Sequence, residues 1–159
     1  MNLFAYGTLL CADILDKVAG CRPAYAPAVL RGYQRQALTD EVYPAIVAQE
    51  GAVVTGVIYF DVPADAWPCL DRFEGEMYAR GIVRVLCEDG TSVDAATYVI
   101  KPEFAYRLAP SEWSAEEFLA SGRKRFEAEY SGFDKVGNRR RRGSMLVRNR
   151  HGTGGREAH

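Results

Sequence analysis

The chain has 159 residues, of which 48% are hydrophobic and 26% are charged, and its formal net charge is −1. This length and composition are typical of one globular domain with its own core, and the near-zero charge argues against binding nucleic acid or a membrane through bulk charge. Because no stretch approaches the ~20 apolar residues that cross a bilayer, and the first residues carry no basic export signal, we expect a cytoplasmic protein.

The first half of the chain favours strands, with one helix near its start. Short apolar runs bounded by turn residues predict four strands, at Leu3–Tyr6, Ala28–Gly32, Tyr43–Val47 and Val53–Phe60. Helical spacing of apolar residues predicts a helix over Leu9–Val18 that is stopped by Gly20. Gly51 and Gly56 are expected to bend or bulge the strands that contain them.

A helix followed by a β-hairpin is predicted in the middle of the chain. Asp61 opens a segment whose apolar spacing indicates a helix ending at Glu74, in which Pro68 either lies in a first turn or bends the helix. Strand sequence then runs over Met77–Cys87, and Asp89-Gly90 is a two-residue hairpin signal. The returning strand is expected to place one set of side chains on a single face, namely Val93, Ala95, Thr97 and Val99.

The last predicted helix begins at a capping box. Ser114 and Glu117 form the S-x-x-E pattern, in which the serine caps the helix, and apolar residues continue at helical spacing to Tyr130. We therefore place a domain over residues 1–133 and a basic, Arg/Gly-rich tail, expected to be flexible, over residues 134–159. Several strands with few helices, at least one strand pair being antiparallel, indicate an α+β domain.

Common cofactor and catalytic signatures are missing from the sequence. It contains no glycine-rich dinucleotide or phosphate loop, no serine nucleophile elbow and no zinc-protease motif. The four cysteines are scattered without a C-x-x-C pair, so we expect reduced thiols, and both histidines, His151 and His159, lie in the tail. We therefore expect neither a metal nor a cofactor, which leaves carboxylates, tyrosines, hydroxyls and backbone amides for chemistry.

The first candidate site is Tyr6-Gly7-Thr8-Leu9, where a predicted strand turns into a predicted helix. A glycine at this point lets the backbone approach a ligand closely. The N–H groups at the start of a helix suit a carboxylate or a developing oxyanion. A plain strand-to-helix turn, without a ligand, is the alternative interpretation.

The second candidate is Glu74, which ends a predicted amphipathic helix beside Phe73 and before Gly75. A carboxyl group held against aromatic rings has a raised pKa, and this suits proton transfer near neutral pH. A solvated glutamate at the end of a helix is the alternative interpretation.

The third candidate is the arginine run Arg139–Arg142 in the tail. A basic run can hold phosphates or RNA. This tail, however, lacks interleaved aromatic residues and any recognisable nucleic-acid module. The sequence therefore favours a solvated tail over a nucleic-acid partner.

Taken in order, these segments resemble the gamma-glutamylcyclotransferase-like family. The family's first hallmark is a strand that runs into a Y-G-[ST]-L loop, here Tyr6-Gly7-Thr8-Leu9. Its second is L-D-x-F-E-G followed by a tyrosine and a basic residue, here Leu70–Gly75 with Tyr78 and Arg80. The closing pattern that resembles the gamma-glutamylamine cyclotransferase branch consists of Trp113, Phe118, Leu119, Phe126, Tyr130, Gly132 and Phe133.

The resemblance implies a small mixed, mainly antiparallel β-barrel with flanking helices. It also implies an enzyme that needs no cofactor and releases 5-oxoproline from a small γ-glutamyl amine, amide or peptide, the substrate's own α-amine attacking its γ-carbonyl. The family's catalytic acid/base falls on Glu74. Its substrate-holding loop falls on Tyr6, Gly7, Thr8, Leu9, Leu10 and Cys11.

Three alternatives stay open at this level. Tyr78 can orient the substrate, or it can be a packed tyrosine with a satisfied hydroxyl. Asp71 and Glu76 are rival carboxylates, although the family's pattern favours Glu74. A non-catalytic member of the same fold that binds a small amine or amino-acid derivative is the alternative function, and the oligomeric state is left open.

Overall fold

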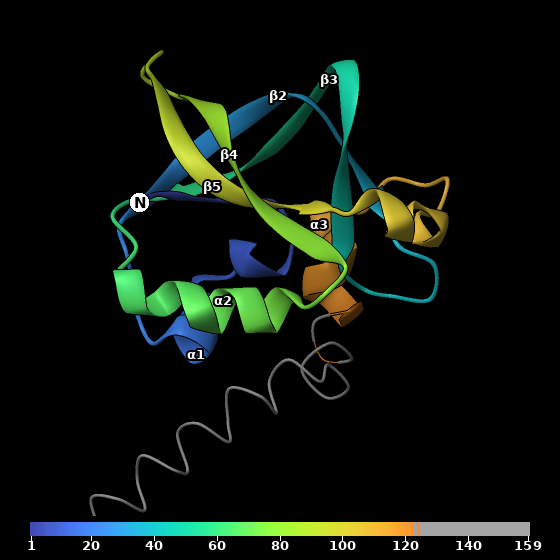
Figure 1. Cartoon of the computed structure of the whole chain (residues 1–159), viewed down its shortest axis with the longest axis horizontal. Helices are drawn as coiled ribbons and strands as arrows, with labels where there is room; N and C mark the ends of the chain where they lie inside the picture. The colour runs from blue at the N-terminus through green and yellow to red at the C-terminus, as the bar shows by residue number, and fades with distance from the viewer. Residues whose placement is uncertain (123, 125–159) are drawn as a thin grey trace, which may run out of the picture.

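The computed structural model describes residues 1–122 and 124, in which five strands form a closed barrel (Figure 1). The strands are β1 (Leu3–Ala5), β2 (Tyr25–Ala37), β3 (Pro44–Tyr59), β4 (Tyr78–Cys87) and β5 (Ser92–Ile100). Their order around the barrel is β1-β3-β2-β4-β5. β1 pairs parallel with β5, and the other four pairings are antiparallel. The expected mixed, mainly antiparallel barrel is thus confirmed.

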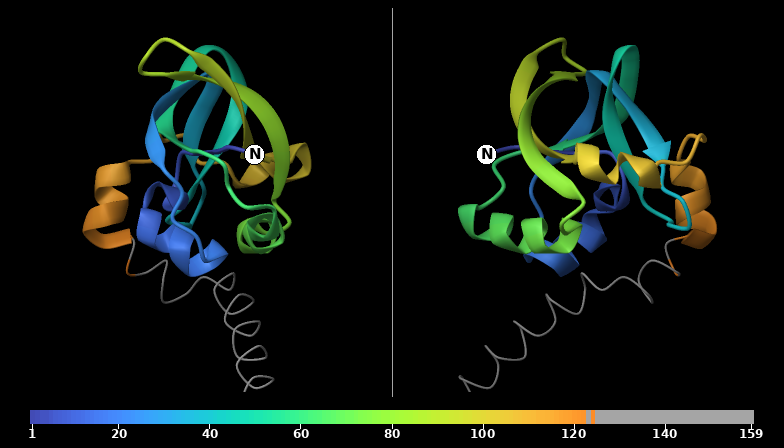
Figure 2. Two further views of the ribbon diagram at one scale, coloured as in Figure 1. Left: turned by 90° about the vertical axis from the view of Figure 1, so that its left-hand side faces the viewer. Right: turned by 45° about the vertical axis from the view of Figure 1, so that its right-hand side comes forward.

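The helices pack on one side of this barrel, away from the tip of the β4–β5 hairpin and from the bends in the middle of β2 and β3 (Figures 1 and 2). The α-helices of the described residues are α1 (Ala12–Ala19), α2 (Trp67–Glu74) and the single turn α3 (Ala115–Glu117). The shorter turns are 3-10 turns at Thr8–Leu10, Ala64–Ala66 and Pro102–Arg107, and a π turn at Phe118–Gly122. α1 and α2 lie side by side and cover the same part of the barrel.

The core consists of two apolar layers. They arise because successive side chains of β5 point to opposite faces of the sheet. Val93, Ala95 and Val99 belong to a cluster built from strand residues and their immediate neighbours, which fills the barrel. Tyr98 and Ile100, on the other face of the same strand, pack in a second cluster with residues of α1 and α2. The face expected from the sequence is therefore confirmed as the barrel interior, but the opposite face is buried as well.

The remaining member of the interior face, Thr97, is fully buried with its hydroxyl satisfied. Its Oγ1 donates a hydrogen bond to the carbonyl oxygen of Phe4 at 3.0 Å. A buried hydroxyl without a partner would be costly, so this bond explains how a polar residue is tolerated inside the barrel. It also ties β5 to β1 at the point where the barrel closes.

Two strands are much longer than the sequence predicts. The expected strands Tyr43–Val47 and Val53–Phe60 are parts of the single strand β3, which bends at Gly51 (φ 80°) instead of ending there. β2 likewise continues past Gly32, where its register with β3 shifts. A bulge of this kind bends a strand without ending its pairing. From the sequence alone such a glycine looks like a turn, which explains the wrong boundaries.

The first helix begins later than predicted. The expected helix Leu9–Val18 is divided into the 3-10 turn Thr8–Leu10 and α1, because Cys11 between them has an extended backbone (ψ 111°). The predicted stop at Gly20 is confirmed. Leu9 is buried in the core through this early turn, so packing of the turn overrides the helical spacing.

The hairpin between β4 and β5 has a three-residue loop in place of the expected two residues. Leu86 pairs with Ser92, and the N–H of Cys87 bonds the carbonyl oxygen of Thr91 at 2.8 Å. In a three-residue loop the glycine alone takes a positive φ. Asp89 is thereby spared the left-handed conformation that a two-residue loop would impose on it.

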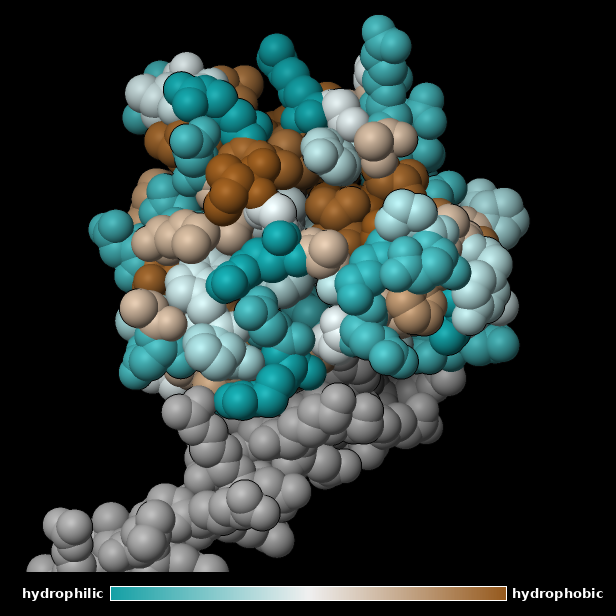
Figure 3. All heavy atoms as spheres, viewed as in Figure 1, coloured by the Kyte–Doolittle hydropathy of each residue, from teal (hydrophilic) through white to brown (hydrophobic). Residues whose placement is uncertain are grey.

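Helix α2 begins at Trp67, after a separate 3-10 turn at Ala64–Ala66, so it starts later than the predicted entry at Asp61. Pro68 lies in its first turn, which is one of the two predicted alternatives. Trp67, Leu70 and Phe73 are buried against the barrel, whereas Asp71 and Arg72 are exposed. Figure 3 shows the molecule from the same side as Figure 1. Polar side chains cover the part that contains α2, and apolar side chains gather higher, over the strands (Figure 3). The buried stripe fixes the rotation of α2 about its axis.

The predicted capping box is present at α3. The Ser114 side chain accepts a hydrogen bond from the N–H of Glu117 at 3.3 Å. The predicted continuation of this helix to Tyr130 and the tail over residues 134–159 lie outside the described residues.

Gly56 is needed where β3 passes β1. A Cβ at this position would overlap the carbonyl oxygen of Ala5 and lie 2.9 Å from the ring of Phe4. Gly56 pairs with Ala28 of β2 in regular antiparallel register. The expected bend at Gly56 is therefore wrong, and the glycine serves a close approach between two strands.

Gly56→Ala should destabilise the protein by about 3 kcal/mol, because the added methyl group must push β1 away from β3. Urea denaturation followed by circular dichroism measures this loss. Gly81→Ala on β4 is the matched control, since a Cβ there meets nothing within 4 Å. Equal stabilities of the two variants would contradict the close approach.

Candidate active site

The segment that follows β1 makes a tight turn whose backbone is held from two sides. Arg35 Nη1 donates to the carbonyl oxygen of Tyr6 at 2.8 Å, and the hydroxyl of Tyr59 donates to the carbonyl oxygen of Leu9 at 2.7 Å. Since a trans peptide points its N–H away from its carbonyl, the Arg35 bond turns the N–H of Gly7 to the opposite side. The turn is thus fixed before any ligand arrives.

The N–H groups of this turn differ in their availability. The N–H of Leu10 bonds the carbonyl oxygen of Gly7 at 3.0 Å, and that of Cys11 bonds the carbonyl oxygen of Thr8 at 3.3 Å. The N–H groups at the start of such a turn have no acceptor within it. Those of Gly7, Thr8 and Leu9 are therefore the donors that the turn leaves to a ligand.

Gly7 has no room for a side chain. A Cβ at this position would lie 2.8 Å from two ring carbons of Pro44, at the start of β3. A proline ring cannot rotate away as a flexible side chain can. The glycine predicted for close backbone approach is therefore required, although it approaches Pro44 in this structure.

Glu74 is positioned by the end of α2. The helix stops at Gly75, whose N–H bonds the carbonyl oxygen of Asp71 at 3.1 Å, and β4 begins three residues later at Tyr78. Phe73 beside it is buried in the core. Glu74 itself is half-buried, so the sequence alternative of a solvated glutamate is not what the structure has.

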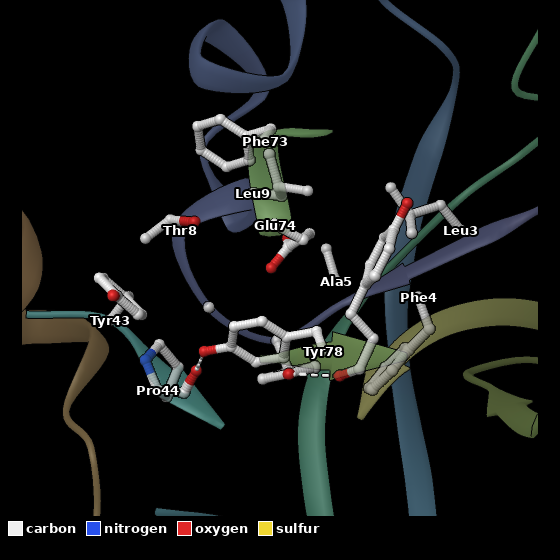
Figure 4. A pocket seen from close by; sticks show the side chains of 13 residues that line it. Leu3, Phe4, Ala5, Thr8, Leu9, Tyr43, Pro44, Phe73, Glu74 and Tyr78 are labelled. Carbon is white, nitrogen blue, oxygen red and sulfur yellow. Dashed lines mark hydrogen bonds between the residues drawn. The ribbon is translucent and has the colours of Figure 1, made fainter. Parts of the chain in front are cut away.

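Glu74 and the turn after β1 line one pocket of about 420 Å³ including its open mouth. In Figure 4 the carboxyl group of Glu74 points into the space bounded by Thr8, Ala5 and Tyr78. The complete lining is Leu3, Phe4, Ala5, Tyr6, Gly7, Thr8, Leu9, Tyr43, Pro44, Phe73, Glu74, Tyr78 and Tyr98. Two motifs about sixty residues apart in sequence therefore meet in space.

Two tyrosines of the pocket already use their hydroxyl groups within the protein. Tyr78 donates to the carbonyl oxygen of Pro44 at 2.7 Å, and Tyr6 donates to that of Tyr98. Both residues are buried. Their rings form walls of the pocket, and the hydroxyl of Tyr78 is satisfied within the protein.

The pKa of Glu74 is raised from 4.5 to about 8, first by burial of the carboxyl group and then by the nearby charge of Asp71. Asp71 is held by the hydroxyl of Tyr98, which donates to its Oδ1 at 2.7 Å, and by Arg80 at 3.5 Å. Its side chain is 45% exposed, so water screens part of this repulsion. Burial is the stronger cause, and Glu74 is mostly protonated at neutral pH.

The other predicted residues lie outside this pocket. Leu10 and Cys11 line a second hollow on the other side of the turn. The carboxyl group of Asp71 contacts Tyr98 and Arg80, and Glu76 is exposed. Neither rival carboxylate is among the residues that line the pocket with Glu74.

Seven lining residues were not predicted as part of the site, and four of them belong to segments that lead into predicted residues, namely Leu3, Phe4, Ala5 and Phe73. Of the other three, Tyr43 directly precedes β3, Pro44 begins it, and Tyr98 comes from β5. The alternation of side chains along β5 was a usable signal for Tyr98, because Tyr98 lies on the face opposite Ala95 and Thr97. No local pattern marks Tyr43 or Pro44, which reach the pocket only through the pairing of β3.

Within residues 1–122 and 124, no group of three or more His, Cys, Asp or Glu side chains has an arrangement that could hold a metal ion. In the same residues no helix is both long and apolar enough to cross a membrane. The four cysteines form no disulfide and are half-buried.

Comparisons with known proteins give one family. The family model described as "Gamma-glutamyl cyclotransferase, AIG2-like" matches residues 3–115. Protein AIG2 C of Arabidopsis thaliana is 33% identical over 130 residues, covering 79% of this chain and 76% of the relative. The solution structure of an Arabidopsis thaliana protein has a TM-score of 0.61 at 30% identity, covering 79% of this chain and 84% of that one.

A more distant solved structure, of a gamma-glutamyl cyclotransferase, has a TM-score of 0.55 at 20% identity. The match covers 64% of this chain and 66% of the other. At this identity the likeness concerns the fold alone. The barrel with its flanking helices is therefore shared with proteins that differ widely in sequence.

The raised pKa of Glu74 predicts a pH-dependent stability. Between pH 4.5 and about 8 the folded chain keeps a proton that the unfolded chain loses, so the free energy of unfolding should fall as the pH rises through this range. Glu74→Gln should lack this slope and gain stability relative to wild type. Urea denaturation at several pH values measures both, with Glu76→Gln as the control for loss of one carboxylate. Parallel curves for wild type and Glu74→Gln would contradict the raised pKa.

Proposed function

The chain belongs to the gamma-glutamyl cyclotransferase, AIG2-like family, and from that premise we propose that it releases 5-oxoproline from a small γ-glutamyl compound with Glu74 as general acid/base. The observation that carries the proposal is the pocket that Glu74 shares with the turn after β1. A proton carrier and a set of backbone donors face one cavity, which is the equipment that cyclisation of a γ-glutamyl group requires.

The reaction begins with the substrate's own α-amine. Its nitrogen attacks the γ-carbonyl carbon, a new N–C bond closes the five-membered ring, and the carbonyl oxygen takes the negative charge. The Glu74 carboxylate accepts the proton that the amine must lose. Because nucleophile and carbonyl belong to one molecule, holding the substrate in a folded conformation supplies much of the rate.

The second step breaks the original amide bond. The tetrahedral intermediate collapses, its C–N bond to the departing amine breaks, and Glu74 returns the proton to that nitrogen. The products are 5-oxoproline and a free amine, and Glu74 is again a carboxylate. A pKa of about 8 for Glu74 keeps both proton transfers close to balance, because amines and this carboxyl group then hold protons with similar strength.

Backbone donors near Glu74 suit the negative charge of the intermediate. The N–H groups of Gly7, Thr8 and Leu9 are left free by the turn's own bonds, and fixed donors of this kind stabilise an oxyanion without having to reorganise. Arg35 and Tyr59 hold the carbonyl groups of the same turn. We infer that these two residues position the donors and do not touch the substrate.

Glu74→Gln should reduce 5-oxoproline release by at least about 100-fold, since removal of a general acid/base costs 10²–10⁴-fold. A mass-spectrometric screen of γ-glutamyl amines, amides and peptides, run on wild type and variant side by side, measures it. Glu76→Gln, an exposed neighbour, is the matched control and should keep wild-type rates. Release of 5-oxoproline by Glu74→Gln at the wild-type rate would contradict the role of Glu74 as general acid/base. Binding of a γ-glutamyl compound with no turnover in wild type would instead favour a non-catalytic binding protein.

The pH dependence of kcat/KM should follow Glu74. The base must be ionised, so kcat/KM should rise with pH and level off above about 8, the pKa of Glu74. Asp71→Asn removes the charge that helps to raise this pKa and should move the rise to lower pH, while the amide oxygen can still accept from Tyr98. The same substrate is used for all variants, so the titration of its amine contributes equally to every profile and does not affect the differences between them. Asp94→Asn, whose side chain is 68% exposed beside Arg84, is the control; an unshifted profile in Asp71→Asn would contradict the assignment.

A further inference from the structure

A second hollow, of about 550 Å³ with its open mouth, lies on the other side of the turn that follows β1. We name it the acceptor hollow. The described residues that line it are Gly7, Leu10, Cys11, Asp13, Trp113, Ala115, Phe118 and Leu119. It is bounded on one side by the turn and the start of α1, and on the other by α3 and the π turn after it.

The lining of the acceptor hollow is mostly apolar. Apart from Gly7 and the exposed carboxylate Asp13, its described side chains are apolar or carry sulfur, and none of them is a lysine or arginine. Leu119 is 59% exposed even though it is a large apolar residue. Concave apolar surface of this kind is the usual lining of small-molecule sites, and it favours hydrocarbon over an anionic group.

One wall of the acceptor hollow is rigid. The rings of Trp113 and Phe118 pack with their centroids 5.5 Å apart. Trp113 donates its indole N–H to the carbonyl oxygen of Val42 at 2.7 Å, and the guanidinium of Arg35 lies 5.3 Å from its ring centroid. A wall held in this way loses little freedom when a ligand binds.

The two cavities adjoin at Gly7, which lines both the Glu74 pocket and the acceptor hollow. In the proposed reaction the γ-carbonyl oxygen meets the N–H groups of Gly7, Thr8 and Leu9, so the departing nitrogen, bonded to the same carbon, also lies near this turn. The substituent on that nitrogen must extend out of the Glu74 pocket. The apolar surface that adjoins the pocket at Gly7 is the acceptor hollow.

We propose that the acceptor hollow binds the hydrocarbon part of the leaving amine, so that the preferred substrates are γ-glutamyl amides of apolar amines. This inference rests on the proposed function. Each methylene buried from water strengthens binding up to about fourfold. Binding energy from this remote part of the substrate can also hold the reacting groups in place, so kcat/KM rises with the length of the tail until the hollow is filled.

The experiment compares γ-glutamyl-hexylamide with γ-glutamyl-methylamide on the full chain. We expect kcat/KM for 5-oxoproline release to be at least about 30-fold higher for the hexyl compound, less than the limit that five fully buried methylenes would give. Equal values for the two compounds would overturn the acceptor hollow while leaving the proposed function intact. Release from neither compound would count against the proposed function.

Variants at the surface locate the effect. Leu119→Glu places a charge in the acceptor hollow at a residue that is 59% exposed, so folding should tolerate it, and the hexyl-to-methyl ratio should fall at least about tenfold. Tyr106→Glu is the matched control, because Tyr106 is 76% exposed and lines neither cavity. An unchanged ratio in Leu119→Glu would overturn the proposal.

Binding separates the acceptor hollow from catalysis. Calorimetric titration of the Glu74→Gln protein with both compounds needs no turnover. Tighter binding of the hexyl compound that Leu119→Glu removes supports the hollow even if the wild type releases no 5-oxoproline. Equal binding of the two compounds to Glu74→Gln overturns it, whatever the wild-type activity is.

Discussion

The insertion of β1 between β3 and β5 is the constraint on which the rest of the structure depends. Its three residues pair antiparallel with β3, Leu3 also pairs parallel with Ala96 of β5, and this short strand closes the barrel. It fits only because Gly56 on β3 lacks a side chain beside Ala5. The chain leaves β1 directly into the turn of Gly7, so the closure of the barrel also sets where the backbone donors of the pocket lie relative to Glu74.

The burial of Glu74 has opposite effects on folding and on the proposed chemistry. Removing a carboxyl group from water costs stability whenever it is ionised, and the same removal raises its pKa to about 8. Helix α2 can hold the group there because Phe73 and Leu70 anchor it to the barrel. Strain of this kind is typical of functional positions and is offset by packing elsewhere.

Local patterns predicted the parts of the structure that are local. The end of α2 at Glu74, the stop at Gly20 and the Ser114 cap follow from side-chain spacing and end signals, and the structure has all three. The long strands were missed because a bulged glycine and a turn glycine look alike in sequence. Pro44 and Tyr98 reach the pocket through strand pairing over tens of residues, which no short motif encodes. The meeting of the two motifs could be expected only from the family resemblance.

The turn after β1 presents different chemistry to its two sides. Toward Glu74 it offers the main chain of Gly7, the side chain of Thr8 and the body of Leu9, whereas Leu10 and Cys11 face the acceptor hollow. Backbone N–H groups are the same whatever the side chain. Substitutions at Leu10 or Cys11 can therefore reshape one cavity while the donors in the other stay in place. Under the proposed function, descendants of one gene can in this way diverge in the amine that they release, with the groups for ring closure unchanged.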